Sequence, residues 1–138
     1  MTTNQEKIRY LKQYQMTIME IERRKQDVNM WRDVLQKVTA SYSSGLKGGG
    51  TIRNRTEELI AKIVDLERHL HEKLARQISL QHEIEQLVEG VGDSRERLLL
   101  QYRYLDGMTF EEIAVKLNLS WRWVHTLHSR ALDNVNIN

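Results

Sequence analysis

Residues 95–132, RERLLLQYRYLDGMTFEEIAVKLNLSWRWVHTLHSRAL, decide the fold of the C-terminal part of this chain. The first part of the stretch predicts a helix that ends in a tight turn. Thr109 and Glu112 then have the T-x-x-E spacing of a capping box, in which each side chain binds the backbone amide of the other residue. This box predicts a second helix, which runs to about Leu117.

A second tight turn separates this helix from the last one. Asn118 and Leu119 form the turn, and Ser120 is a favourable N-cap because its hydroxyl can accept a hydrogen bond from a free amide of the first helical turn. The stretch therefore has a helix, a turn, and two short helices joined by a second turn. This is the layout of a helix-turn-helix that reads DNA.

The last helix has two different faces. Val124, Leu127 and Ala131 are spaced by three and four residues, so they share one inward face. No acidic residue lies between Ser120 and Leu132, which suits the other face to a polyanion. That other face consists of Trp121, Arg122, His125, Thr126, Ser129 and Arg130.

The same residues carry a family resemblance. The segment LDGMTFEEIAVKLNLS, residues 105–120, followed by Val124, Leu127 and the run RAL, resembles region four of bacterial sigma factors. It is more similar still to the small sigma-like regulators of phages and prophages of low-GC Gram-positive bacteria. The resemblance covers roughly the last third of the chain. It implies a module that binds the upstream promoter element.

The chain departs from the sigma pattern at two positions. Where Arg122 stands the pattern often has Glu, and where Thr126 stands it often has Gln, and both of those residue types read bases. The resemblance therefore implies DNA binding but does not carry an operator sequence over to this chain.

We expect nine residues to contact DNA. Arg122, in the first turn of the last helix, is expected to reach base edges, and Arg130, more than two turns later, to bind phosphate. Trp121 is expected to pack on the sugar-phosphate backbone and Trp123 to lean on the preceding helix; in the alternative, both tryptophans close a small core. The full set is Thr109, Ser120, Trp121, Arg122, Trp123, His125, Thr126, Ser129 and Arg130.

Composition limits the class of protein. Hydrophobic residues make up 40% and charged residues 29% of the 138 residues, and the absence of proline favours long amphipathic helices and an all-α fold. The absence of cysteine excludes disulfides, thiolate metal sites and cysteine nucleophiles. The N-terminus MTTNQEKIRY lacks the apolar core of a signal peptide, and no run is long enough to cross a bilayer, so we expect a cytoplasmic protein.

The net charge of +2 gives the chain a modest electrostatic footprint. Residues 93–138 contain six basic and six acidic residues, although the last helix keeps Arg122 and Arg130 unopposed until Asp133. Because few phosphates can be neutralised, a single module is expected to bind DNA weakly and to need a dimer or a second protein.

Two apolar stripes predict two long helices in residues 1–92. The first begins at a capping box of Thr3 and Glu6 and runs to about Ser41; the second, residues 55–89, lies between the glycine-rich residues 43–50 and 90–92. The first stripe contains Leu11, Tyr14, Ile18, Ile21, Val28, Trp31, Leu35 and Val38, and the second contains Leu59, Ile63, Leu66, Leu70, Leu74, Ile78, Ile84 and Leu87.

The two stripes must be covered, because helices gain more stability from packing than from intrinsic propensity. The simplest arrangement is an antiparallel, coiled-coil-like hairpin, and the alternative is a coiled coil between subunits. We therefore expect two parts: a hairpin in residues 1–92 for oligomerisation or interaction, and a DNA-binding domain in residues 93–138. Two helices bury one narrow seam, so the hairpin is expected to pair again as a homodimer or higher oligomer.

No chemical site is expected elsewhere. The glycine tract around Lys47 lacks the Ser or Thr and the preceding strand of a phosphate-binding loop. His125 and His128 are three apart, but no third metal ligand has a suitable spacing, and no catalytic constellation of side chains converges. We therefore expect a protein that is not an enzyme and has no catalytic residues, metal or cofactor.

Two functions are consistent with these patterns. The first is a phage-type transcriptional regulator that places residues 120–132 in the major groove and uses the hairpin to dimerise or to reach RNA polymerase. The alternative is a small-terminase-like subunit of a phage DNA-packaging motor, in which a helix-turn-helix and oligomerising helices also occur together. A dimer would favour the regulator, and a ring of eight or more subunits the packaging protein.

Overall fold

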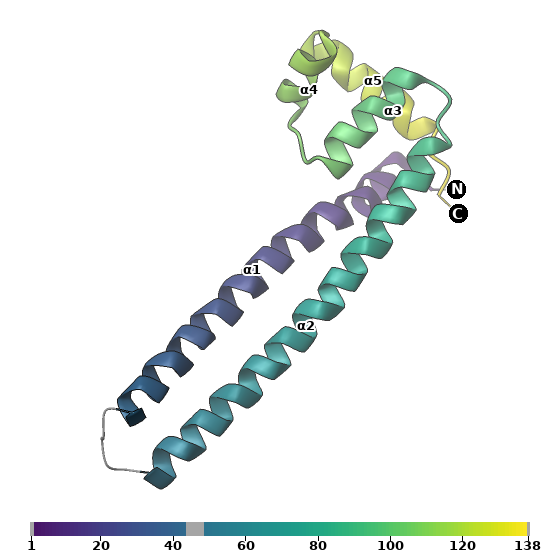
Figure 1. Cartoon of the computed structure of the whole chain (residues 1–138). Helices are drawn as coiled ribbons and strands as arrows, with labels where there is room; N and C mark the ends of the chain where they lie inside the picture. The colour runs from purple at the N-terminus through teal and green to yellow at the C-terminus, as the bar shows by residue number, and fades with distance from the viewer. Residues whose placement is uncertain (1, 44–48, 138) are drawn as a thin grey trace. The chain divides into compact units, whose positions relative to one another are not determined.

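The computed structural model describes residues 2–43 and 49–137, and every regular element in these ranges is helical. The all-α prediction is therefore confirmed. Two long helices pack together and are followed by a helical C-terminal module (Figure 1). The elements are α1 (Asn4–Ser43), α2 (Gly49–Glu89), α3 (Ser94–Leu100), the π-helix η1 (Gln101–Leu105), α4 (Phe110–Leu117) and α5 (Trp121–Asp133).

The chain forms two compact units, and α1 and α2 contribute to both. The first unit contains Met1–Ile18 and Arg76–Asn138, and the second contains Met19–Ala75. Within each unit the two long helices run in opposite directions and pack side by side (Figure 1). The boundary that the sequence predicts at residue 92 stays a prediction.

In the second unit, an apolar seam joins the two helices. Its buried residues are Ile21, Val28, Leu59 and Ile63. Polar contacts line its edges: Arg32 on α1 forms an ion pair with Glu67 on α2, and the Nζ atom of Lys73 lies 2.7 Å from a carboxylate oxygen of Glu20. These contacts fix the side-by-side pairing of the helices, but each exposed pair contributes only a few tenths of a kcal/mol to about 1 kcal/mol.

In the first unit, the ends of α1 and α2 share a core with the C-terminal module. Val88 and Val91 are fully buried and belong to the same cluster as Leu100, Tyr104 and Leu132. The Nζ atom of Lys7 donates to the carbonyl of Leu132 at 2.8 Å. The full cluster contains Leu11, Tyr14, Leu80, Ile84, Val88, Val91, Leu100, Tyr104, Ala131, Leu132 and Val135.

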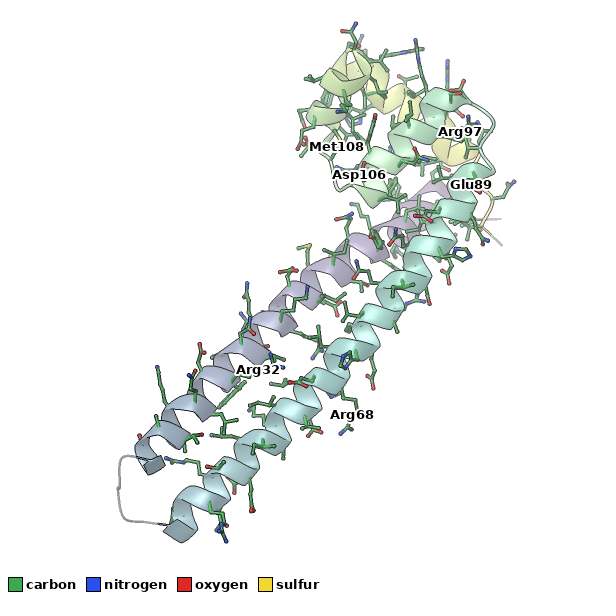
Figure 2. All side chains as sticks on the ribbon, viewed as in Figure 1. Arg32, Arg68, Glu89, Arg97, Asp106 and Met108 are labelled. Atoms are coloured by element: carbon green, nitrogen blue, oxygen red, sulfur yellow. The ribbon has the colours of Figure 1, made fainter. Side chains whose placement is uncertain are left out.

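The connection between α2 and α3 is held by side chains. Asp93 is the N-cap of α3 and accepts from the amides of Arg95 and Glu96. The Arg97 guanidinium, labelled in Figure 2 near Glu89, donates to the carbonyl of Val91 at 2.7 Å. These bonds satisfy several of the backbone groups that helix ends leave without intrahelical partners.

Two sequence expectations about the second helix need correction. The second helix starts at Gly49 rather than near residue 55, since a glycine in a helix costs only about 1 kcal/mol relative to alanine. Ile78 was placed in the inward stripe but is 69% exposed, because it lies two residues, about 200° of helical turn, from the buried Leu80. Leu87, the last residue of the predicted stripe, is partly buried against the same cluster as the fully buried Val88.

Two other expectations concern the ends of the long helices. The capping box at the start of α1 is confirmed: the Glu6 amide donates to the Thr3 hydroxyl at 3.2 Å and the Thr3 amide to Glu6 at 3.1 Å. The turn expected in residues 43–50 falls mainly on residues 44–48, which lie outside the described residues.

Candidate nucleic-acid interface

The two turns of the helix-turn-helix are built from local hydrogen bonds. The Thr109 hydroxyl accepts from the Glu112 amide at 3.1 Å, and the Glu112 carboxylate accepts from the Thr109 amide, so the predicted capping box is confirmed. Asn118 ends α4 with a φ of 56°, in the left-handed region that Asn tolerates better than most residues. The Ser120 hydroxyl accepts from the Trp123 amide at 3.1 Å and starts α5.

The core of this module is small and apolar. Leu99 of α3, Ile113 of α4, and Val124 and Leu127 of α5 are buried against one another. Ala131 is also fully buried, so the predicted inward face of the last helix is confirmed. Packing of α5 against both α3 and α4 holds its opposite face toward solvent.

His128 is a buried residue of α5 that sequence reasoning left without a role. Its Nε2 atom is 2.7 Å from the Tyr104 hydroxyl. Burial, together with the charge of Arg103, lowers the pKa of His128 to about 4, and burial raises the pKa of Tyr104 to about 12. Both groups are therefore neutral at physiological pH. No group of three His, Asp or Glu residues in the described ranges could hold a metal ion.

The centre of the solvent face of α5 is a row of three polar residues. Arg122, Thr126 and Ser129 are spaced by four and three residues, so they lie on one strip of the helix. The Thr126 hydroxyl donates to the carbonyl of Arg122 at 3.3 Å. The Arg122 guanidinium and the Ser129 hydroxyl make no hydrogen bond or ion pair within the described residues, so both can meet a ligand without breaking a contact.

Trp123 and Arg130 lie beside this row. The Arg130 guanidinium carbon is 5.2 Å from the centre of the Trp123 ring, a cation–π contact across two helical turns. Trp123 is 39% exposed and Trp121 is 56% exposed. The alternative in which both tryptophans close a core is therefore wrong, because both keep much of their ring surface in water.

An aromatic stack covers the other flank. The ring of His125 lies 4.1 Å from that of Trp121 and 4.5 Å from that of Phe110, measured between ring centres. The Nε2 atom of His125 is buried and has no hydrogen-bond partner among the described residues. No sequence pattern predicted this role for Phe110, because the histidines that its ring contacts, His125 and His128, are 15 and 18 positions away.

Two of the six acidic residues of the module, Glu111 and Glu112, lie at the start of α4. Glu111 and Glu112 are exposed there, where the helix dipole favours negative charge. The backbone amide of Glu111, aided by the side chains of Trp121 and Thr109, lowers the pKa of the Glu111 carboxyl. Asp133, at the end of α5, accepts a hydrogen bond from the Asn4 side chain at 2.9 Å. The solvent face of α5 before Asp133 is thus polar and basic.

The nine predicted DNA contacts fall into two groups. Seven are exposed, while His125 and Thr126 are half-buried. The hydroxyls of Thr109, Ser120 and Thr126 are engaged with the backbone, and the rings of Trp121, Trp123 and His125 are packed. Within the part of the chain that the structure describes, the side chains of Arg122 and Ser129 form no hydrogen bond or ion pair, and Arg130 stacks on the Trp123 ring.

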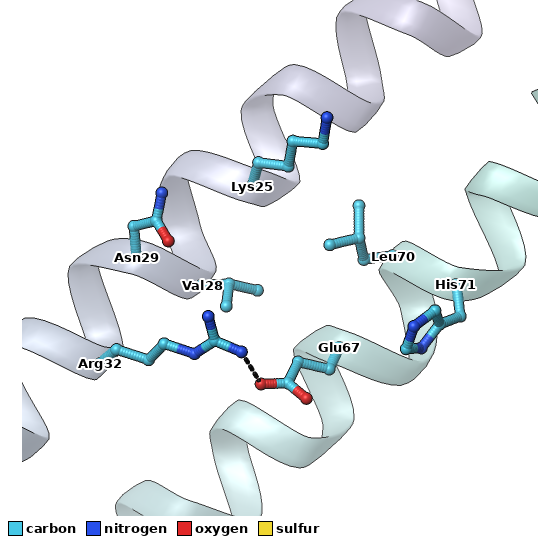
Figure 3. Close-up of a pocket in the computed structure, with 7 residues that line it drawn as sticks. All are labelled: Lys25, Val28, Asn29, Arg32, Glu67, Leu70 and His71. Carbon is cyan, nitrogen blue, oxygen red and sulfur yellow. Dashed lines mark hydrogen bonds and ion pairs between the residues drawn. The ribbon is translucent and has the colours of Figure 1, made fainter.

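The hairpin contains a hollow of about 330 Å³ in the second unit (Figure 3). Its floor includes Val28 and Leu70, and its rim is polar. The lining residues are Lys25, Val28, Asn29, Arg32, Glu67, Leu70 and His71. The rim holds one ion pair, between Arg32 and Glu67, and has no hydroxyl or thiol nucleophile. No described helix is both long and apolar enough to span a membrane.

Comparison with known proteins bears on the C-terminal module. Residues 93–136 match the family model described as Sigma-70, region 4, which is a DNA-binding helix-turn-helix domain and not an enzymatic family. No curated protein and no solved structure matches the chain significantly. The match covers α3, η1, α4 and α5, the elements that present the solvent face of α5, and it supports a role as a DNA-binding regulator.

Proposed function

We propose that this chain is a sequence-specific, double-stranded DNA-binding transcriptional regulator of the phage or prophage type. The observation that carries the proposal is the coincidence of the region 4 match at residues 93–136 with a capped α4–turn–α5 unit. The solvent face of α5 is basic and free of acidic residues up to Asp133, which suits it to the negative charge of DNA.

In the proposed complex, α5 lies in the major groove. Arg122, in its first turn and without a partner within the described residues, is placed to bind the edge of a base, as arginine binds guanine. Arg130 and Ser129 contact phosphates, and the Trp121 and Trp123 rings pack on sugars at the two flanks. Ser120, Thr109, His125 and Thr126 contribute through the backbone and ring packing described above.

The hairpin is proposed to join two copies of the chain or to contact RNA polymerase. The support is electrostatic: residues 93–138 are formally neutral, and few phosphate contacts give weak binding at physiological salt. Two modules held together gain effective concentration, and two-fold symmetry would place half-sites about 10 base pairs apart or a multiple of that.

The proposal is tested by selecting bound fragments from the genome that encodes the chain. Sites that cluster at promoters, together with a dimer in solution, would support a regulator. Sites at a packaging origin, together with a ring of eight or more subunits, would identify a packaging protein instead. Absence of any preferred site would contradict both.

A further inference from the structure

The loop between η1 and α4, residues 106–109, is the entrance to the helix-turn-helix. It starts where η1 ends, with the Asp106 amide donating to the Gln101 carbonyl at 3.0 Å, a spacing of five residues. A helix end leaves its last carbonyls without amide partners. In a π-helical turn, which is rare and often found at functional positions, such free groups need donors from elsewhere.

A side chain of α1 supplies these donors. The Nε2 atom of Gln15 donates to the carbonyl of Leu105 at 3.0 Å and to that of Tyr104 at 3.3 Å. One amide group thus caps two carbonyls that are 89 and 90 positions away in the sequence. Both hydrogen bonds lie within the first compact unit and are partly buried. If they were lost, water would satisfy the two carbonyls less well than Gln15 does.

The same amide group lies directly against Gly107. Gly107 has a φ of +72°, which favours glycine, and a Cβ atom built there would lie 2.8 Å from the Oε1 atom of Gln15. The loop therefore packs on Gln15 through its backbone. A displacement of Gln15 would therefore remove its two hydrogen bonds and its contact with Gly107 together.

A series of contacts connects the loop that Gln15 holds to α5. The Met108 amide donates to the Tyr102 carbonyl at 2.9 Å, and its carbonyl accepts from Arg103 at 3.0 Å. Figure 2 labels Asp106 and Met108, the residues before and after Gly107 in the sequence. Arg103 stacks on Phe110 at 4.1 Å, and Phe110 packs on His125 of α5.

We propose that Gln15 is a positioning residue through which α1 fixes the entrance loop, and thereby the presentation of α5 to DNA. The inference rests on the proposed DNA-binding function. It gives α1 a part in DNA affinity that is separate from dimerisation: a change that moves α1 at Gln15 would change binding without touching any DNA contact.

The test uses the full chain with Gln15→Ala and Gln15→Glu, and with Gln26→Ala, an exposed glutamine of the same helix, as the matched control. Amide hydrogen exchange is measured without DNA, and affinity is measured on a duplex that the wild-type chain selects from a random-sequence pool. Loss of one or two hydrogen bonds predicts exchange at Asp106 and Met108 about tenfold faster and a Kd about three- to tenfold higher. The control is expected to match the wild type.

Three results would overturn the proposal. Unchanged exchange at Met108 in Gln15→Glu would show that the loop does not depend on this side chain. A loosened loop with unchanged Kd would remove its role in DNA binding. Faster exchange throughout the chain would reduce Gln15 to a general contribution to stability. A wild-type chain that selects no duplex would refute the DNA-binding function, while exchange would still decide whether Gln15 holds the loop.

A second variant tests the contact itself. Gly107→Ala should weaken DNA binding for two reasons: strain at positive φ, and displacement of the Gln15 amide, which must move from its carbonyl partners to admit the new methyl group. In a Gln15→Ala background only the strain remains, so the same substitution should cost less affinity. Equal cost in both backgrounds would show that Gln15 and Gly107 act independently and would contradict the proposal.

Discussion

At the residue scale, the two arginines of α5 have different surroundings. Arg122 is unpaired within the described residues, whereas Arg130 is stacked on Trp123. An arginine held against a ring is well placed to contact a phosphate, which requires only charge and direction. An arginine with a free guanidinium can align both nitrogen donors with a guanine edge, which is the contact that carries specificity.

Substitution of each arginine should separate these roles. Arg122→Ala should lose about 1–3 kcal/mol on the preferred duplex and relax sequence preference. Arg130→Ala should weaken all duplexes alike and reduce the salt slope of log Kd by about one. Affinities on specific and random duplexes at several salt concentrations measure both effects. Equal loss on the two duplexes for both variants would contradict the assignment.

His128 makes the stability of the fold dependent on pH. Its folded pKa of about 4 lies below the ordinary value of 6.5, so the unfolded chain binds more protons between these values. Stability from this residue is therefore complete above about pH 6.5 and is lost as the pH falls toward 4, by up to about 3 kcal/mol. Denaturant unfolding of His128→Gln should show a flatter pH dependence than wild type over this range. Parallel curves for the two proteins would show that His128 does not titrate as described.

The contacts that could be predicted from the sequence are those between residues close together in the chain. Capping boxes at Thr3 and Thr109 and the N-cap at Ser120 depend on partners three residues away, so their spacing is visible in the sequence. The Tyr104–His128 bond and the contacts of Gln15 join residues 24 to 90 positions apart. Their existence depends on how the helices pack, and no local pattern marks them.

At the element scale, the long helices show where a heptad pattern fails. The sequence stripe on α2 treats Ile63 and Ile78 alike, since both fit an apolar repeat. The structure buries Ile63, which is 7% exposed, and leaves Ile78 69% exposed. The repeat is ambiguous where apolar residues lie on neighbouring rows, and only packing against α1 decides which row faces inward.

Paired aspartate substitutions measure this difference. Ile63→Asp should destabilise the chain by several kcal/mol, because a carboxylate would enter the seam without a partner. Ile78→Asp should change the free energy of unfolding by about 0.5 kcal/mol or less, as exposed substitutions usually do. Denaturant unfolding and the mass in solution are measured for both. A large effect at Ile78, particularly with loss of an oligomer, would show that this position is covered by another subunit.

At the scale of the whole molecule, one core joins the ends of the long helices to the C-terminal module. One cluster contains Leu80, Ile84 and Val88 of α2 together with Leu100 of α3 and Val135 after α5. This shared core was not predicted, because the apolar stripes of the long helices and the resemblance to region 4 were each read from their own part of the sequence. Neither the apolar stripes nor the resemblance to region 4 predicts that the ends of α1 and α2 pack against the C-terminal module.

Two shortened chains test this shared core. Residues 93–138 alone should be marginally stable or unfolded, since they lose half of the cluster and a short chain buries little surface. A chain in which residues 19–75 are replaced by a short Gly-Ser loop keeps the first compact unit and should fold. Circular dichroism and thermal unfolding distinguish them. A stable, cooperative fold for residues 93–138 alone would show that the hairpin base is dispensable.

Duplex DNA is proposed to bind the solvent face of α5. Amide chemical-shift mapping of the full chain, titrated with the duplex that it selects, measures this binding mode residue by residue. The largest changes are expected at residues 120–130, with small changes at residues 19–75 apart from any that arise from subunit pairing. Changes confined to residues 19–75, or none at residues 120–130 when the duplex is bound, would contradict it.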